Sequence, residues 1–124
     1  MIKKVATDKA PAAIGPYSQA VIAGKMLYAS GQIPINPATG NVEAEGITEQ
    51  AEQSMKNVGE ILKAAGVSYD NVVKTTCFLA EIADFAAFNE VYAKYFTEKP
   101  ERSCVAVKDL PKGVLCEVEV IAVK

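Results

Sequence analysis

The sequence contains no histidine, and this absence limits the chemistry that the chain can perform. Without imidazole there is no histidine general base, no Ser-His or Cys-His nucleophile pair, and no histidine ligand for a metal ion. Any catalysis must therefore use carboxylates, tyrosines, hydroxyl groups, arginine and backbone groups.

Arg102 is the single arginine among 13 basic residues, and it stands at the entry to the apolar run SCVAV. A guanidinium group holds a carboxylate through two parallel hydrogen bonds, which a lysine cannot reproduce. Placement alone leaves a surface arginine as an equally good interpretation. Arg102 is therefore a candidate carboxylate anchor, to be judged together with other residues.

Tyr17, in the segment GPYSQA, and the pair Ser30-Gly31 are weaker candidates. A tyrosine hydroxyl can donate or accept a hydrogen bond, although tyrosines at strand ends are commonly structural. A glycine lets a backbone N–H approach a ligand closely, although an ordinary turn explains Gly31 equally well.

The segment from Val114 to Val123 predicts a long strand with two different faces. Because side chains alternate across a strand, one face is uniformly apolar and should lie beneath helices. The other face mixes glutamates with apolar residues: Leu115, Glu117, Glu119, Ile121 and Val123. Such a face predicts burial between subunits of a closed oligomer. Glutamates buried there would need partners or a function, because an unpaired buried carboxylate is costly.

The elements that must position these residues begin with a predicted β-hairpin. The apolar runs from Ala20 to Ala23 and from Met26 to Ser30 flank a turn at Gly24-Lys25. Residues 31–46 are rich in Gly, Pro and Asn, which predicts an irregular connection. Loops of this length within compact domains are often functional.

Two amphipathic helices follow from apolar residues that recur at helical spacing. The first is expected to be capped by Thr48 and ended by Gly66. The second is expected to be capped by Asp84. Its aromatic stripe is interpreted as core and consists of Phe85, Phe88, Tyr92 and Tyr95.

Further strands are predicted from Val72 to Leu79 and from Ser103 to Val107, with a turn at residues 110–113 before the last strand. The expected order is ββ(β)αβαββ, in which the bracketed strand is not placed. Strands that alternate with two helices predict an α/β (α+β) fold. We expect a two-layer sandwich in which a mixed β-sheet carries both helices on one face. With 124 residues the chain is expected to form a single domain, residues 1–124.

Composition and charge argue against several classes of partner. A net charge of -2 and a pI near 5.2 give no basic footprint for nucleic acid. No apolar run approaches the ~20 residues that span a bilayer, and the first residues lack the apolar centre of a signal peptide. The expectation is a cytoplasmic protein without a membrane partner.

The cysteines Cys77, Cys104 and Cys116 are odd in number and widely spaced, so neither a disulfide framework nor a zinc site is indicated. All three fall in strand-like apolar runs, where reduced and buried cysteines are expected. No metal ion and no cofactor is expected.

Several segments together resemble one protein family. They are APAAIGPYSQA (residues 10–20), SGQIP (30–34), FNEVYAKYF (88–96) and RSCVAVKDLPKGVLCEVEVIAV (102–123). In this order they resemble the reactive intermediate deaminase family, RidA, also called YjgF. The resemblance runs nearly end to end, and RSCVAV followed by LPKG and EVEVIAV is its most specific part.

This resemblance implies a chorismate-mutase-like fold and a homotrimer with clefts at the subunit interfaces. It also implies hydrolysis of 2-aminoacrylate, 2-aminocrotonate and their imine tautomers to 2-oxo acids and ammonia. Pyridoxal-phosphate-dependent enzymes release these intermediates, so the activity would protect such enzymes from damage. An imine carbon is already electrophilic, so positioning and one carboxylate suffice without a metal ion.

The resemblance also implies roles for individual residues. Arg102 matches the arginine that holds the substrate carboxylate, and Glu117 matches the acidic residue that orients the attacking water. Gly31 and Cys104 would contribute backbone groups, respectively to the carboxylate and to the water. The remaining cleft positions have less defined roles and are Tyr17, Ser30 and Asn89.

One departure from the family pattern is Glu101, which stands where small residues are often found. Strand alternation should point Glu101 away from Arg102. Two alternative functions stay open on the sequence: a non-catalytic 2-oxo acid-binding or regulatory module, and a ribonuclease or translation inhibitor. The retention of both Arg102 and Glu117 favours turnover, and the acidic pI counts against RNA.

Overall fold

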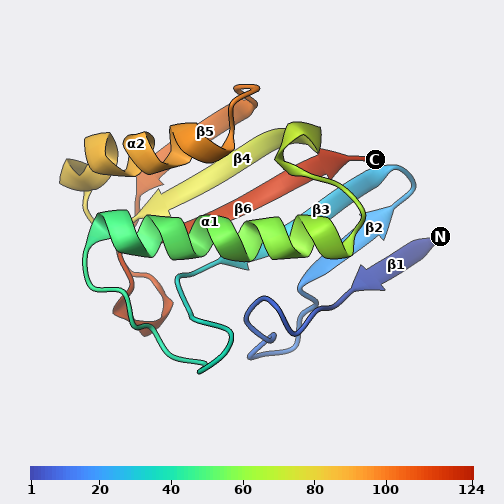
Figure 1. The fold of residues 1–124 in the computed structure, drawn as a ribbon, viewed down its shortest axis with the longest axis horizontal. Coiled ribbons are helices and arrows are strands. Elements are labelled where there is room, and N and C mark those ends of the chain that lie inside the picture. Colours follow the sequence, from blue (N-terminus) through green and yellow to red (C-terminus); the bar gives the residue numbers. More distant parts are fainter.

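The computed structural model describes residues 1–124 as one mixed, six-stranded β-sheet with two α-helices on one of its faces (Figure 1). The predicted α/β (α+β) two-layer sandwich is confirmed. In sequence order the elements are β1 (Ile2–Val5), β2 (Ala20–Ala23), β3 (Met26–Gln32), α1 (Ile47–Ala64), β4 (Val72–Leu79), α2 (Phe85–Tyr95), β5 (Glu101–Ala106) and β6 (Cys116–Val123).

The strands lie side by side in the order β1-β2-β3-β6-β4-β5. Only β4 and β5 run parallel, because α2 carries the chain across the sheet between them, and every other neighbouring pair is antiparallel. The last strand, β6, therefore lies at the centre of the sheet, while β5 forms one of its edges.

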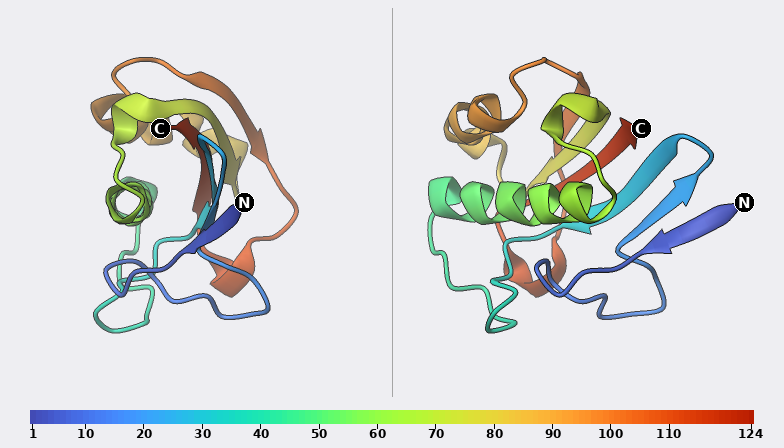
Figure 2. Two further views of the ribbon diagram at one scale, coloured as in Figure 1. Left: turned by 90° about the vertical axis from the view of Figure 1, so that its right-hand side faces the viewer. Right: turned by 45° about the vertical axis from the view of Figure 1, so that its right-hand side comes forward.

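The faces of β6 differ as its sequence pattern predicts. One face is buried beneath the helices and consists of Cys116, Val118, Val120 and Ala122. The opposite face has no helix over it, as the end-on view shows (Figure 2). Its residues are half-buried or exposed, with Glu119 exposed.

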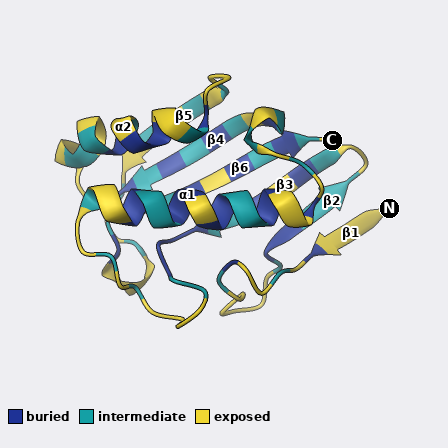
Figure 3. Ribbon diagram, viewed as in Figure 1, coloured by how far each residue is buried: buried dark blue, intermediate teal, exposed yellow.

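The core between the layers is built from the inner sides of the helices and of the central strands (Figure 3). Met55, Ile61 and Leu62 of α1 and Phe88 of α2 are completely buried. Burying a side chain of this size stabilises the fold by roughly 1.5–3 kcal/mol. These residues fix both helices on the sheet, and with them the side chains that α2 presents to β5.

Several local predictions are wrong. The unplaced third strand is β1, which the pattern does not reveal because Val5 is its only buried residue. Gly46, not Thr48, is the N-cap of α1, and Thr48 lies inside the helix. Asp84 does occupy the N-cap position of α2 but forms no side-chain capping hydrogen bond. The helix is instead preceded by a 3-10 turn, Ile82–Asp84.

Other predictions are confirmed. The turn at Gly24-Lys25 joins β2 to β3, and Gly24 has the positive φ of 62° that favours glycine there. The strand from Val72 to Leu79 has the predicted bounds. The irregular connection between β3 and α1 is stabilised by the buried Asn57 of α1. Its amide nitrogen donates hydrogen bonds to the carbonyls of Ile33 at 3.1 Å and Ile35 at 2.9 Å.

Candidate active site

Arg102 lies on β5 and points to the helix-covered side of the sheet, where α2 holds it. Its guanidinium donates a hydrogen bond of 2.7 Å to the side-chain oxygen of Asn89. The central guanidinium carbon lies 4.7 Å from the ring centre of Tyr92 and 5.5 Å from that of Phe85. A cation over an aromatic face is attracted by the ring quadrupole. Arg102 is therefore held in one place as well as charged.

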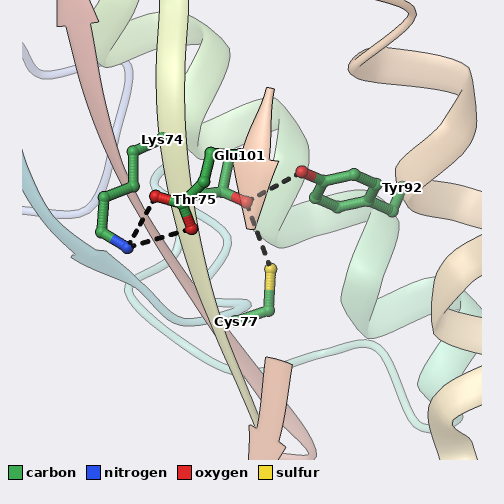
Figure 4. A network of polar contacts seen from close by, with 5 residues as sticks. All are labelled: Lys74, Thr75, Cys77, Tyr92 and Glu101. Carbon is green, nitrogen blue, oxygen red and sulfur yellow. Dashed lines mark hydrogen bonds and ion pairs between the residues drawn. The ribbon is translucent and has the colours of Figure 1, made fainter. Parts of the chain in front are cut away.

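Tyr92 is itself fixed from beneath by a buried hydrogen bond (Figure 4). Its hydroxyl lies 2.8 Å from the hydroxyl of Thr75, a completely buried residue of β4. Burial raises the pKa of Tyr92, so its hydroxyl stays neutral and hydrogen-bonded. The pair Thr75-Tyr92 thus braces the ring on which the guanidinium rests.

Glu101 points away from Arg102, as strand alternation predicts. Its carboxylate accepts from the ammonium of Lys74 at 3.2 Å, on the other face of the sheet (Figure 4). The Lys74 side chain is partly exposed and that of Glu101 largely so, and a solvated ion pair of this kind contributes little to stability. Glu101 therefore leaves the guanidinium free of an internal carboxylate.

Cys104 lies two residues after Arg102 on the same face and is in register with Cys77 of β4. Cys77 and Cys116 are buried as predicted, whereas Cys104 is only half-buried. Burial raises the pKa of the Cys104 thiol, and that of Cys77 to about 12. Both thiols therefore stay protonated at neutral pH, which argues against either sulfur as a nucleophile.

Glu117 lies on β6 and points to the opposite, open face of the sheet. Its carboxyl group occupies the space beside Gly31, where any added Cβ atom would clash with it. The register between β3 and β6 is irregular between Ala29 and Gln32, which is where Ser30 and Gly31 lie. Gly31 is therefore required because it leaves room for the Glu117 carboxyl group, a reason that sequence alone does not reveal.

A cavity of about 420 Å³ surrounds this carboxyl group. Its lining consists of Ile14, Tyr17, Ser30, Gly31, Ile33, Pro111, Glu117 and Glu119. Burial raises the pKa of Glu117, and the neighbouring charge of Glu119 raises it further. A carboxylate with a raised pKa is a better proton acceptor than an ordinary glutamate.

Tyr17 and Ser30 hold the loop above this cavity. The Tyr17 hydroxyl accepts a hydrogen bond of 3.3 Å from the backbone N–H of Ile14. The Ser30 hydroxyl donates to the carbonyl oxygen of Ser18 at 2.7 Å. The Ser30 N–H donates to the carbonyl oxygen of Gln19 at 2.9 Å. Both side chains are thus hydrogen-bonded to the backbone of this loop.

The candidate residues form two separate groups within the chain. One group lies on the helix side of the sheet, at its β5 edge, and consists of Arg102, Asn89 and Cys104. Arg102 there pairs with Thr75 of β4. Glu117 lies beside Phe78 on the opposite face, together with Tyr17, Ser30 and Gly31. Alternation and the intervening strand β4 prevent the two groups from meeting in one chain.

Sequence reasoning missed the residues that support Arg102. Tyr92 belongs to the core as its spacing predicts, whereas Phe85 is 38% exposed. The rings of both residues face the guanidinium. The available signal was the spacing of Phe85, Asn89 and Tyr92, which places all three on one helical face. Thr75 carried no such signal.

Two further features bear on the class of protein. No group of three or more His, Cys, Asp or Glu side chains is arranged to hold a metal ion. None of the helices is both long and apolar enough to cross a membrane. Fold and residues thus define a small α+β protein with a braced arginine on one side of its sheet and a half-buried glutamate on the other.

Comparison with known proteins identifies the family. The family model described as Endoribonuclease L-PSP matches residues 7–124. The chain therefore belongs to this family, which is the YjgF/RidA family.

Similar proteins cover nearly the whole chain. The human 2-iminobutanoate/2-iminopropanoate deaminase is 50% identical over 121 residues, which cover 97% of this chain and 88% of that protein. The Escherichia coli (strain K12) protein of the same name is 51% identical over 128 residues, covering 100% and 99%. A Lactococcus lactis protein that is named as a regulator, AldR, is 54% identical over 122 residues, covering 98% and 97%.

Solved structures agree with the fold. Escherichia coli TdcF, solved with bound serine, superposes with a TM-score of 0.93 at 47% identity, covering 98% of both chains. RidA from an Antarctic Psychrobacter superposes with a TM-score of 0.95 at 44% identity, covering 98% of this chain and 99% of that one.

The buried hydrogen bond between Thr75 and Tyr92 should stabilise the fold. Thr75→Val leaves the buried Tyr92 hydroxyl without a partner and should lower the free energy of unfolding by about 1–3 kcal/mol. The double variant Thr75→Val/Tyr92→Phe removes both polar groups and should lose less than the sum of the single losses. Urea denaturation of Thr75→Val, Tyr92→Phe and the double variant measures this coupling. Strictly additive losses of unfolding free energy would show that the two hydroxyls do not interact.

Proposed function

We propose that this protein hydrolyses reactive enamines and imines, such as 2-aminoacrylate, 2-aminocrotonate and their imine tautomers, to 2-oxo acids and ammonia. The observation that carries the proposal is the braced guanidinium of Arg102. Asn89 accepts from one of its N–H groups, which leaves other donors of the planar fork for a substrate carboxylate. The human and Escherichia coli relatives are named for this activity on 2-iminobutanoate and 2-iminopropanoate.

Glu117 is the group we assign to the water. The enamine first tautomerises to an imine. Once the imine nitrogen is protonated, water attacks the carbon of the C=N bond. Glu117 accepts a proton from that water and later returns one to the nitrogen, so that the carbinolamine expels ammonia and leaves a carbonyl group. The raised pKa of Glu117 suits both transfers. The chemistry requires no electron transfer and no cofactor.

The remaining residues position the reactants in this scheme. Gly31 offers its backbone N–H to the substrate carboxylate, and the backbone of Cys104 holds the water. Asn89 fixes the guanidinium, while Tyr17 and Ser30 keep the loop closed over the carboxyl group. Serine bound in the TdcF structure carries a carboxylate of the kind that Arg102 would hold.

We further propose that the active protein is a homotrimer in which each site joins the Arg102 group of one chain to the Glu117 group of the next. Two observations support this arrangement: the two groups lie on opposite faces of the sheet, and the open face carries apolar side chains. Tyr28 and Val105 are each 47% exposed, and Leu115, Ile121 and Val123 are half-buried. A neighbouring chain would cover this surface. The cytoplasmic location remains a prediction from the sequence.

Regulation and RNA cleavage are less well supported as functions. A regulator that only binds a 2-oxo acid would need Arg102 but gives no reason for a half-buried carboxylate in the cavity, and one relative is named as a regulator. The family description refers to a ribonuclease, yet the chain has a net charge of -2 and no histidine. The presence of both a braced Arg102 and a half-buried Glu117 favours hydrolysis.

The direct test of function is release of 2-oxo acid from 2-iminobutanoate generated in situ, measured above spontaneous hydrolysis. Arg102→Ala should lower kcat/KM by ~30-fold or more, because truncating one partner of a desolvated charge pair costs about 2–5 kcal/mol. Arg102→Lys should restore little, because the fork is lost. Lys74→Gln removes only the exposed pair with Glu101 and serves as the control. Full activity of Arg102→Ala would refute the anchor.

The pH dependence tests Glu117. Only the ionised carboxylate accepts a proton, so kcat/KM should rise with pH through a pKa above the ordinary value of about 4.3. Glu119→Gln removes one cause of the raised pKa and should shift this rise to lower pH while activity is kept. Glu117→Gln should slow turnover and abolish the rise. If the rise of kcat/KM with pH were the same in both variants as in the wild-type protein, the proton transfer would belong to another group.

A further inference from the structure

Gln32, in the segment SGQIP, is a buried polar residue to which the hydrolytic scheme assigns no role. It is the last residue of β3 and is only 5% exposed. A buried side-chain amide is costly unless its polar atoms find partners. The amide nitrogen of Gln32 donates a hydrogen bond of 3.2 Å to the carbonyl oxygen of Ser30. The side chain of Gln32 therefore holds a backbone group two residues before it.

The backbone of Ser30 and Gly31 lies in a β-bulge and depends on such contacts. The register between β3 and β6 shifts between Ala29 and Gln32, so neither Ser30 nor Gly31 has a regular partner on β6. Backbone groups outside a ladder must be satisfied by other groups. The Ser30 N–H donates to the carbonyl oxygen of Gln19 at 2.9 Å, and its carbonyl oxygen accepts from Gln32. Both polar backbone groups of Ser30 are thus fixed.

The carbonyl group of Ser30 belongs to the same peptide unit as the N–H group of Gly31. The chain contains no cis peptide bond, so the two groups of this planar unit point in opposite directions. By holding the carbonyl oxygen, the Gln32 amide fixes the direction of the Gly31 N–H. A hydrogen bond to the carbonyl oxygen also polarises the peptide unit, which strengthens its N–H as a donor.

Gly31 connects the Gln32 amide to the cavity that surrounds Glu117. Gly31 lines this cavity, and its backbone lies against the Glu117 carboxyl group. Gln32 does not line it, but shares with Gly31 the lining of a separate, smaller cavity of about 30 Å³. Gln32 can therefore act on a molecule beside Glu117 only through the backbone of Gly31.

We propose that Gln32 is a positioning residue for the substrate carboxylate, acting through the N–H group of Gly31. The inference rests on the proposed function and deepens it. A donor that already points at its acceptor costs no reorganisation when the substrate binds. Arg102 of a neighbouring chain would hold the same carboxylate, so the Gly31 N–H is the contribution of the chain that also supplies Glu117.

Gln32→Met tests this role, because methionine keeps a long, unbranched side chain and lacks the donor. It should raise the KM for 2-iminobutanoate generated in situ, and the Kd of 2-oxobutanoate in calorimetry, by ~10-fold. The kcat should change by less than about threefold, because a hydrogen bond made equally in the ground state and the transition state affects binding alone.

Gln50→Met is the matched control. Gln50 is also a buried glutamine, 6% exposed, and its amide donates to the carbonyl oxygen of Ala44 at 3.1 Å and accepts the Leu115 N–H at 2.8 Å. This variant should lower the free energy of unfolding, yet leave the Kd of 2-oxobutanoate within about twofold of the wild-type value. Equal rises of Kd in Gln32→Met and Gln50→Met, or no rise in Gln32→Met, would overturn the positioning role.

The amide resonance of Gly31 gives a readout that does not depend on stability. In the wild-type protein, 2-oxobutanoate should move the Gly31 amide proton downfield, because a charge-assisted hydrogen bond forms, and Gln32→Met should diminish this shift. An unmoved resonance in the wild-type protein would overturn the inference even if Gln32→Met fails to fold. A wild-type protein that shows the shift but hydrolyses no imine would support the role of Gln32 in carboxylate binding and contradict the proposed function.

Discussion

Side-chain alternation across a sheet that carries helices on only one face is the constraint on which the rest of this structure depends. Arg102 on β5 faces the helix side, where Asn89, Tyr92 and Phe85 of α2 receive its guanidinium. Glu117 on β6 faces the open side, where Gly31 leaves space for its carboxyl group. A shift of either strand by one residue would exchange these environments, because the side-chain period is two.

The same constraint determines the surroundings of each charged group, and with them the mobility of Arg102 and the pKa of Glu117. Arg102 rests on an aromatic ring that is braced by Thr75, so little rotamer freedom is left to be lost when a carboxylate binds. Glu117 has a raised pKa because it is partly withdrawn from water and stands near Glu119. That environment costs folding free energy when Glu117 is ionised, and it makes the carboxylate a stronger base.

The architecture follows from the sequence because its main signals are strong and periodic. The uniform apolar face of β6 and the stripe of α1 specify the two layers, and both are confirmed. Short or context-dependent features are missed: β1 buries one residue, and the N-cap of α1 is set by Gly46 rather than by the nearby Thr48. Residue type and placement single out Arg102, Tyr17 and Ser30-Gly31, whereas the roles of the candidates and the choice of Glu117 came from a family resemblance. Their division between two faces, and the support of Arg102 by Tyr92 and Phe85, required the pairing of the strands.

The most direct test of this account mixes two inactive chains. Arg102→Ala and Glu117→Gln each remove a different group, so in coexpressed mixed oligomers some sites regain both. If the chains assort at random in a closed ring, about a quarter of the wild-type activity should return. We expect this recovery of imine hydrolysis in the mixture, with each variant alone inactive. A mixture no more active than its components, in oligomers shown to contain both chains, would contradict a site shared between chains.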